Sequence, residues 1–171
     1  MNKQEIRIPH YNESDFVDRE EETHVVLDKV DALVDNRPVH RRVVVFVGER
    51  GTGKTWLLRH LEHKATSIDP EVKPFTIDLE AYRAWYPLVA VTDILESLAE
   101  RLGVRRKNLG AAPAELSRNL IQAAQRWLED RILVMFVDHV YESDWSLLAA
   151  VEDYVLGPLA VEPRTLIVMT G

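Results

Sequence analysis

The sequence contains no cysteine among its 171 residues. Disulfide bonds and thiolate metal ligands are therefore excluded, which agrees with a cytoplasmic protein. No apolar run approaches the about 18 residues that a membrane-spanning helix needs, and residues 1–9 lack the apolar core of a secretory signal. We expect neither a membrane span nor a disulfide-rich secreted fold.

Positive charge is also scarce, since 21 Lys and Arg stand against 28 Asp and Glu, a formal net charge of −7. A surface devoted to nucleic acid usually carries an excess of positive charge, so nucleic acid is not indicated as a partner. A chain of 171 residues suffices for one α/β domain with a hydrophobic core but is short for two.

Apolar strands and amphipathic helices alternate along the chain. The strand candidates are residues 43–47, 73–79, 132–137 (ending at Asp138) and 165–169. The continuous apolar run at residues 43–47 is typical of a strand buried on both faces. The helix candidates are residues 20–34, 54–64, 113–129, one capped by Thr92 or Asp93 that ends at Leu102, and one capped by Ser143 or Asp144 that Gly157-Pro158 breaks. This alternation predicts a three-layer α/β fold, a parallel sheet with helices on both faces.

The predicted elements fall into two parts. Residues 1–40 form an N-terminal arm and helix, and residues 41–171 form the core. The last strand runs directly into the end of the sequence, so we expect these residues to be the front part of a longer protein.

The strongest functional signal is a match to the phosphate-binding pattern G-x-x-x-x-G-K-[ST]. Its residues are Gly48, Glu49, Arg50, Gly51, Thr52, Gly53, Lys54 and Thr55, between a predicted strand and a predicted helix. Glycines at 48, 51 and 53 allow positive φ angles, so that backbone N–H groups and the helix N-terminus converge on phosphate oxygens.

Within this loop, Lys54 is expected to reach the β- and γ-phosphates of a nucleotide, and the Thr55 hydroxyl to ligate Mg²⁺. We include Trp56 among the nucleotide-contacting residues, although its place on a helix also suits a core side chain. The sequence therefore predicts a nucleotide site with Mg²⁺ as cofactor.

A second acidic position follows the apolar strand 132–137. Asp138 is expected to hold Mg²⁺ through a water molecule, although an aspartate can also simply end a strand at a turn. His139 stands where many ATPases have a second acid, and Glu142 lies close enough to act as the catalytic base instead. At the tip of the last strand, Thr170 is a candidate to sense the γ-phosphate.

These residues resemble the signal-transduction ATPases with numerous domains (STAND), part of the AAA+ group, which include the NB-ARC and NACHT switches. The resemblance rests on four stretches in the expected order: residues 16–22 (FVDREEE), 48–55, 137–142 (VDHVYE) and 166–171 (LIVMTG). The phosphate-binding loop is specific, and the other three are weaker. Two departures are Asp18, where the family has glycine, and His139, which puts fast hydrolysis in doubt.

The resemblance implies an ATP/ADP switch with slow Mg²⁺-dependent hydrolysis. Adenine would lie beside Phe16, Val17 and Arg19, and Lys54, Asp138 and Glu142 would carry the catalysis. The strands would lie in the order second, third, fourth, then the strand before the phosphate-binding loop, which would be left at an open edge. A fifth strand, an arginine sensor and a helical lid would follow residue 171, and protein partners or self-association would involve those regions.

Two other functions remain open from the residues alone. One is a nucleotide-stabilised interaction module that does not hydrolyse ATP. The other is a small-molecule kinase in which Asp78 binds the phosphate acceptor, although Asp78 also suits a turn residue. ATP rather than GTP is implied by the family likeness, and the sequence has no guanine-reading Asn-Lys-x-Asp motif.

Overall fold

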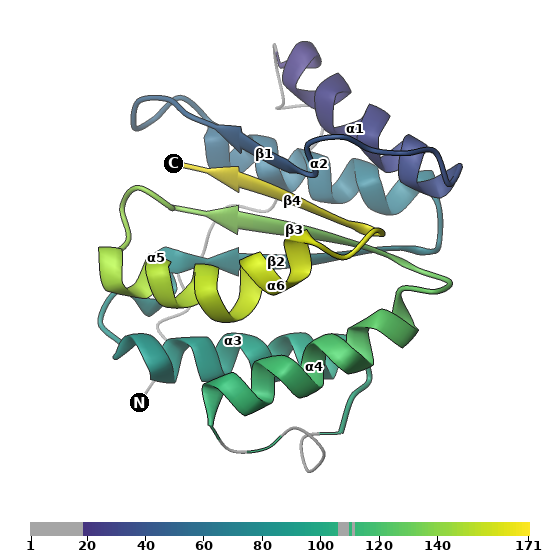
Figure 1. Ribbon diagram of the computed structural model, residues 1–171. Coiled ribbons are helices and arrows are strands. Elements are labelled where there is room, and N and C mark those ends of the chain that lie inside the picture. Colours follow the sequence, from purple (N-terminus) through teal and green to yellow (C-terminus); the bar gives the residue numbers. More distant parts are fainter. Residues whose placement is uncertain (1–18, 106–109, 111) are drawn as a thin grey trace.

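A computed structural model describes residues 19–105, 110 and 112–171. Its centre is a sheet of parallel strands, β1 (Val43–Phe46), β2 (Val72–Asp78), β3 (Ile132–Asp138) and β4 (Thr165–Thr170), in the order β1-β4-β3-β2. The α/β class, the parallel sheet and the strand order predicted from the sequence are confirmed. All four strands point their carboxyl ends to the same edge of the sheet (Figure 1).

Helices cover both faces of this sheet (Figure 1). The helices α1 (Glu20–Val34) and α2 (Lys54–Ile68) pack on one face. The other face carries α3 (Pro87–Arg101), α4 (Pro113–Trp127), α5 (Trp145–Val151) and α6 (Gly157–Ala160), with a π-helical turn, η4 (Glu152–Leu156), between the last two. A short 3-10 helix, η2 (Leu79–Tyr82), follows β2 directly.

The central strand β3 shows how the sequence pattern produces the two cores. Successive side chains of a strand point to opposite faces, so Met135 packs toward α3 and α4 while Phe136 packs toward α1 and α2. Every residue of β3 is buried. An uninterrupted apolar run is therefore what a central parallel strand requires.

Strand β1 behaves differently, although its sequence is equally apolar. Val43 and Val45 are 42% and 43% exposed, whereas Val44 and Phe46 pack against the core under α1 and α2, so only one face of this edge strand is covered among the described residues. The expectation that residues 43–47 are buried on both faces is therefore wrong. The expectation of an open edge beside this strand is confirmed for the described residues.

Several helix boundaries also differ from the expectations, including the end of α4 at Trp127 instead of residue 129. Helix α3 begins at Pro87 instead of Thr92 or Asp93, because proline at the first helical position needs no N–H partner. Helix α2 continues past Lys64 to Ile68. Gly157 and Pro158 do not break the last helix, since the chain passes through η4 and Pro158 lies at the start of α6, where its missing N–H is harmless.

Within the part of the chain that the structure describes, no helix has the length and apolar character needed to cross a membrane.

Candidate functional site

The loop between β1 and α2 has the backbone that its glycines permit. Gly51 and Gly53 adopt φ angles of +85° and +81°, in the left-handed region that favours glycine. Gly48 does not have a positive φ, so that expectation is wrong. Its need for glycine is one of space, because a Cβ at Gly48 would lie 3.1 Å from the Thr52 hydroxyl oxygen.

Lys54 opens helix α2, with Gly53 as the N-cap residue. Its ammonium donates to the carbonyls of Gly48 and Glu49 at 2.7 and 2.8 Å, which folds the side chain back over the loop. Thr52 stabilises the same turn by donating from its hydroxyl to the Glu49 carbonyl at 2.9 Å. The loop is thus a compact hydrogen-bonded turn with one cation above it.

Arg19, which precedes α1, also contacts this loop. Its guanidinium donates to the carbonyl of Thr52 and, at 3.0 Å, to the carboxylate of Glu22. The residue predicted to border the adenine is therefore held against the phosphate-binding loop. Phe16 and Val17, predicted for the same role, lie outside the described residues.

The ends of β3 and β4 face the loop. Asp138 is only 6% exposed, and its Oδ1 accepts hydrogen bonds from the His139 N–H at 2.9 Å and from the Thr170 hydroxyl. Thr170 is fully buried. Two neighbouring strands therefore cooperate to orient one carboxylate at the carboxyl edge of the sheet.

His139 lies among several carboxylates. Its Nδ1 donates to Oδ1 of Asp78 at 2.9 Å and lies 3.6 Å from Oδ2 of Asp138, while its Nε2 lies 3.8 Å from Oε2 of Glu80. Burial by itself lowers the pKa of the imidazole, but the negative charges of Asp138, Asp78 and Glu80 outweigh it, so the pKa is raised above its usual 6.5. The backbone of His139 has a φ of +60°.

Sequence reasoning did not assign Glu80 to the site, and it treated Asp78 only as a turn residue or a kinase residue. Asp78 does serve the turn, because its Oδ1 accepts from the Glu80 N–H at 3.0 Å. The register of β2 and β3 also pairs Asp78 with Asp138, so both aspartates end their strands at the same level. Knowledge of that register is the signal that would have placed Asp78 and Glu80 beside His139.

A cleft of about 370 Å³ separates the loop from the strand ends. Residues from both sides line it: Arg50, Gly51, Gly53, Lys54, Thr55, Trp56, Glu80, Asp138, His139, Glu142 and Gly171. Most of the predicted site residues therefore meet in one place. Gly48, Glu49, Thr52 and Thr170 support the walls from behind and do not line the cleft.

A parallel sheet, a glycine-rich loop leading into a helix, and an aspartate at the tip of a nearby strand together define the P-loop nucleotide-binding fold. A family model described as an AAA domain matches residues 34–142, which is more than half of the sequence. The chain belongs to this AAA domain family. Membership implies a P-loop ATPase domain that binds a nucleotide, usually with Mg²⁺.

One similar solved structure is that of PCH-2 from C. elegans, with a TM-score of 0.51 and 15% sequence identity. The alignment covers 88% of this chain and 36% of the PCH-2 chain, so this chain spans about a third of that protein. At this identity the likeness shows the fold alone. Among curated proteins, none matches the sequence.

The donor set of the cleft fits a magnesium nucleotide. Lys54 offers a cation for phosphate oxygens, and the backbone of Gly51 and Gly53 is open toward the cleft, with nothing within 4 Å of where a Cβ would stand. Thr55 and Asp138 carry a hydroxyl and a carboxylate, the hard oxygen groups that Mg²⁺ prefers as ligands. Hydroxyl, carboxylate and ammonium thus occupy one cleft in the combination that this chemistry needs.

Proposed function

We propose that this chain is an ATP-binding switch domain of the STAND type that hydrolyses ATP slowly. The observation that carries the proposal is the single cleft that Lys54 and Thr55 of the loop line together with Asp138 of the strand end. Mg²⁺–ATP would be held with its phosphates on the loop and its metal between Thr55 and Asp138. The choice of ATP over GTP rests on the family resemblance.

Each residue has a defined task in this proposal. Lys54 exchanges its two carbonyl partners, Gly48 and Glu49, for oxygens of the β- and γ-phosphates. Oδ1 of Asp138 accepts hydrogen bonds from the Thr170 hydroxyl and the His139 N–H. These two bonds fix the carboxylate, so the position of its other oxygen is also fixed. Mg²⁺, when bound, supplies charge neutralisation on the γ-phosphate.

Slow hydrolysis follows from the residue after Asp138. His139 faces carboxylates with both ring nitrogens, Nδ1 donating to Asp78 and Nε2 lying 3.8 Å from Glu80, so it does not replace the second acid that activates the attacking water in many ATPases. Glu142, exposed and lining the cleft, is the better-placed carboxylate for that task. Its position four residues beyond Asp138 makes alignment with the water less constrained, which favours a switch over a fast ATPase.

The switch needs the state of the nucleotide to reach the rest of the molecule. The Thr170–Asp138 hydrogen bond joins the metal-side carboxylate to β4, and the Arg19–Thr52 contact joins the loop to the segment before α1. In this proposal, ATP and ADP change these two hydrogen bonds differently, and the change alters contacts with protein partners or with other copies of the chain.

Calorimetric titration with Mg²⁺–ATP, Mg²⁺–ADP and Mg²⁺–GTP tests nucleotide binding. Wild-type protein should bind adenine nucleotides selectively, and Lys54→Ala should lose most of the affinity because the cation for the phosphates is gone. Lys64→Ala is the matched control, since it removes the same charge from α2 about 15 Å further along the helix. Equal affinities in wild-type and Lys54→Ala protein would contradict the assignment of the phosphate site.

Phosphate release under saturating ATP tests the hydrolytic part separately. Slow turnover that disappears in both Lys54→Ala and Glu142→Gln supports the proposed base. Binding without any turnover would identify the chain instead as a nucleotide-stabilised interaction module. Turnover that Glu142→Gln leaves unchanged would refute the role of Glu142.

A further inference from the structure

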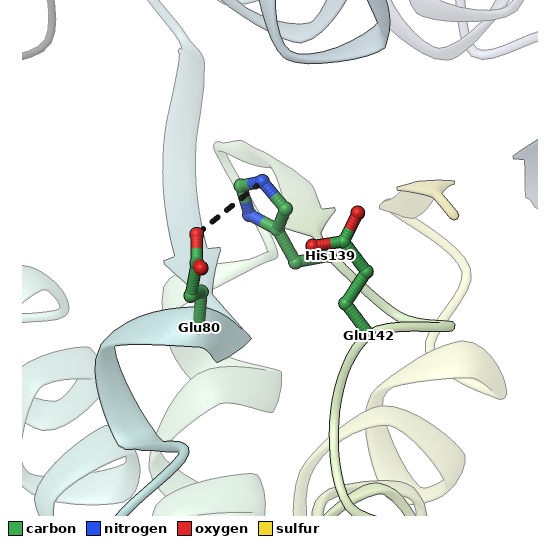
Figure 2. Close-up of side chains that lie close together, drawn as sticks. All are labelled: Glu80, His139 and Glu142. Carbon is green, nitrogen blue, oxygen red and sulfur yellow. Dashed lines mark ion pairs between the residues drawn. The ribbon is translucent and has the colours of Figure 1, made fainter. Parts of the chain in front are cut away.

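Three side chains that line the cleft lie close to one another and have no assigned role in binding the nucleotide. Glu80 comes from η2, and His139 and Glu142 come from the loop after β3. One ligand atom of each lies within 4.8 Å of the others. Figure 2 shows the two carboxylates on either side of the imidazole ring.

The histidine is oriented as a metal ligand would be. Carboxylates only accept hydrogen bonds, so the 2.9 Å contact with Asp78 assigns the ring hydrogen to Nδ1 of His139. Nε2 is then the nitrogen available to an ion, and it lies 3.8 Å from Oε2 of Glu80. Histidines that bind metals usually donate their other N–H to a carboxylate in this way, and here Asp78 is that outer partner.

The spacing of the three groups suits one ion. Ligand atoms that are each about 2.1 Å from a common metal lie roughly 3 to 4 Å apart. The 3.8 Å between Nε2 and Glu80 is already within this range. Glu142 is exposed, so its side chain can close the remaining distance without disturbing the core.

The donor chemistry separates this cluster from the magnesium position. Thr55 and Asp138 offer only oxygen, whereas Glu80, His139 and Glu142 offer one imidazole nitrogen and two carboxylates. Imidazole nitrogen favours zinc and the neighbouring divalent transition metals over Mg²⁺. The carboxylates of Asp78 and Asp138, beside the same ring, add negative charge that favours a divalent cation there.

We propose that Glu80, His139 and Glu142 bind a divalent transition-metal ion, of the Zn²⁺ class, at a site beside the magnesium position. A further consequence rests on the proposed function. An ion that holds Glu142 removes this carboxylate from the attacking water, so occupation of the site would slow ATP hydrolysis and prolong the ATP-bound state.

The test uses Co²⁺ as a spectroscopic probe on the nucleotide-free protein, in excess Mg²⁺ so that the all-oxygen position is filled. Wild-type protein should bind one Co²⁺ with the visible absorption of a nitrogen- and oxygen-ligated ion, and Zn²⁺ should displace it. His139→Asn should abolish this signal. Asparagine is chosen because it tolerates the positive φ at this position and so preserves the loop.

Two further variants separate ligands from positioning residues. Glu80→Gln should weaken Co²⁺ binding strongly, and Asp78→Asn, which removes a nearby negative charge and the carboxylate that orients the histidine, should weaken it by about 10- to 100-fold. His63→Asn is the matched control, because this exposed histidine lies on α2 roughly 13 Å along the helix from Lys54. Unchanged Co²⁺ binding in His139→Asn protein, or no binding by wild-type protein, would overturn the proposal.

A final comparison distinguishes the proposed transition-metal site from the magnesium position. Thr55→Val should weaken Mg²⁺–nucleotide binding and leave Co²⁺ affinity in the nucleotide-free protein unchanged. If Thr55→Val and His139→Asn weakened Co²⁺ equally, the ion would occupy the magnesium position and the separate site would be refuted. Since Co²⁺ binding is measured without nucleotide, failure of the nucleotide proposal would leave this result standing, and the reverse is also true.

Discussion

Replacing Thr170 by valine removes one buried hydrogen bond while nearly preserving the shape of the side chain. The Thr170 hydroxyl is completely buried and donates to Oδ1 of Asp138. A hydrogen bond to a charged group contributes about 1.5 to 3 kcal/mol to stability. Burying a methyl group in place of the hydroxyl returns about 0.8 kcal/mol. We therefore expect Thr170→Val to lower the free energy of unfolding by about 1 to 2 kcal/mol.

Urea denaturation at pH 7 measures this loss, which corresponds to a Tm decrease of roughly 2 to 8 °C for a chain of this size. Thr170→Ser is the control, because it keeps the hydroxyl and should retain the Asp138 contact at the cost of one methyl group. Mg²⁺–ATP affinity should also fall in the valine variant, since Asp138 loses one of its two orienting donors. A valine variant as stable as wild type, with equal Mg²⁺–ATP affinity, would refute the reasoning.

Three other predictions follow from the described contacts. Because the pKa of His139 is raised in the folded state, its ion pairs stabilise the protein fully below pH 6.5 and lose this effect as the pH rises through the folded pKa. Urea midpoints of wild-type and His139→Asn protein should therefore converge toward alkaline pH; a constant difference would contradict this. The pKa of Asp144 is lowered by hydrogen bonds from the Ser146 hydroxyl and N–H, so Asp144→Ala should destabilise the protein at neutral pH, and thermal melts should show the difference vanishing as pH falls through the folded pKa. Leu120→Ala, at a fully buried position on α4, should lower the free energy of unfolding by about 2 to 5 kcal/mol in urea while leaving Mg²⁺–ATP affinity unchanged.

Local signals in the sequence were sufficient for much of the fold. The bounds of α1 agree with the prediction, and Asp144 caps α5 as expected, with its carboxylate accepting from the Ser146 N–H at 2.8 Å. Both features depend on residues close in sequence, where apolar periodicity and capping chemistry act directly. The start of α3 was misplaced because Thr92 has capping chemistry but instead donates within the helix to the Leu88 carbonyl at 2.8 Å.

The phosphate-binding loop was also predictable from the sequence, because its residues are consecutive. Eight consecutive residues specify its turn, its cation and its hydroxyl, and the neighbouring strand and helix confirm the context. The reason for glycine at position 48 could not be predicted from the sequence. It is the closeness of the Thr52 side chain and not a positive φ. A glycine in the sequence indicates that a positive φ is allowed. A steric contact between two residues of a loop is known only once the loop is folded.

By itself, then, the sequence determined the alternating elements, the nucleotide loop and the acidic strand tip at Asp138, since each is encoded by residues within a few positions of one another. Only the tertiary structure decided that Asp78 ends β2 level with Asp138, and that Glu80 and Glu142 meet at His139. The physical reason is that the register of two parallel strands is set by packing across a crossover of more than fifty residues. The same packing left β1 at the edge of the described sheet despite its apolar sequence.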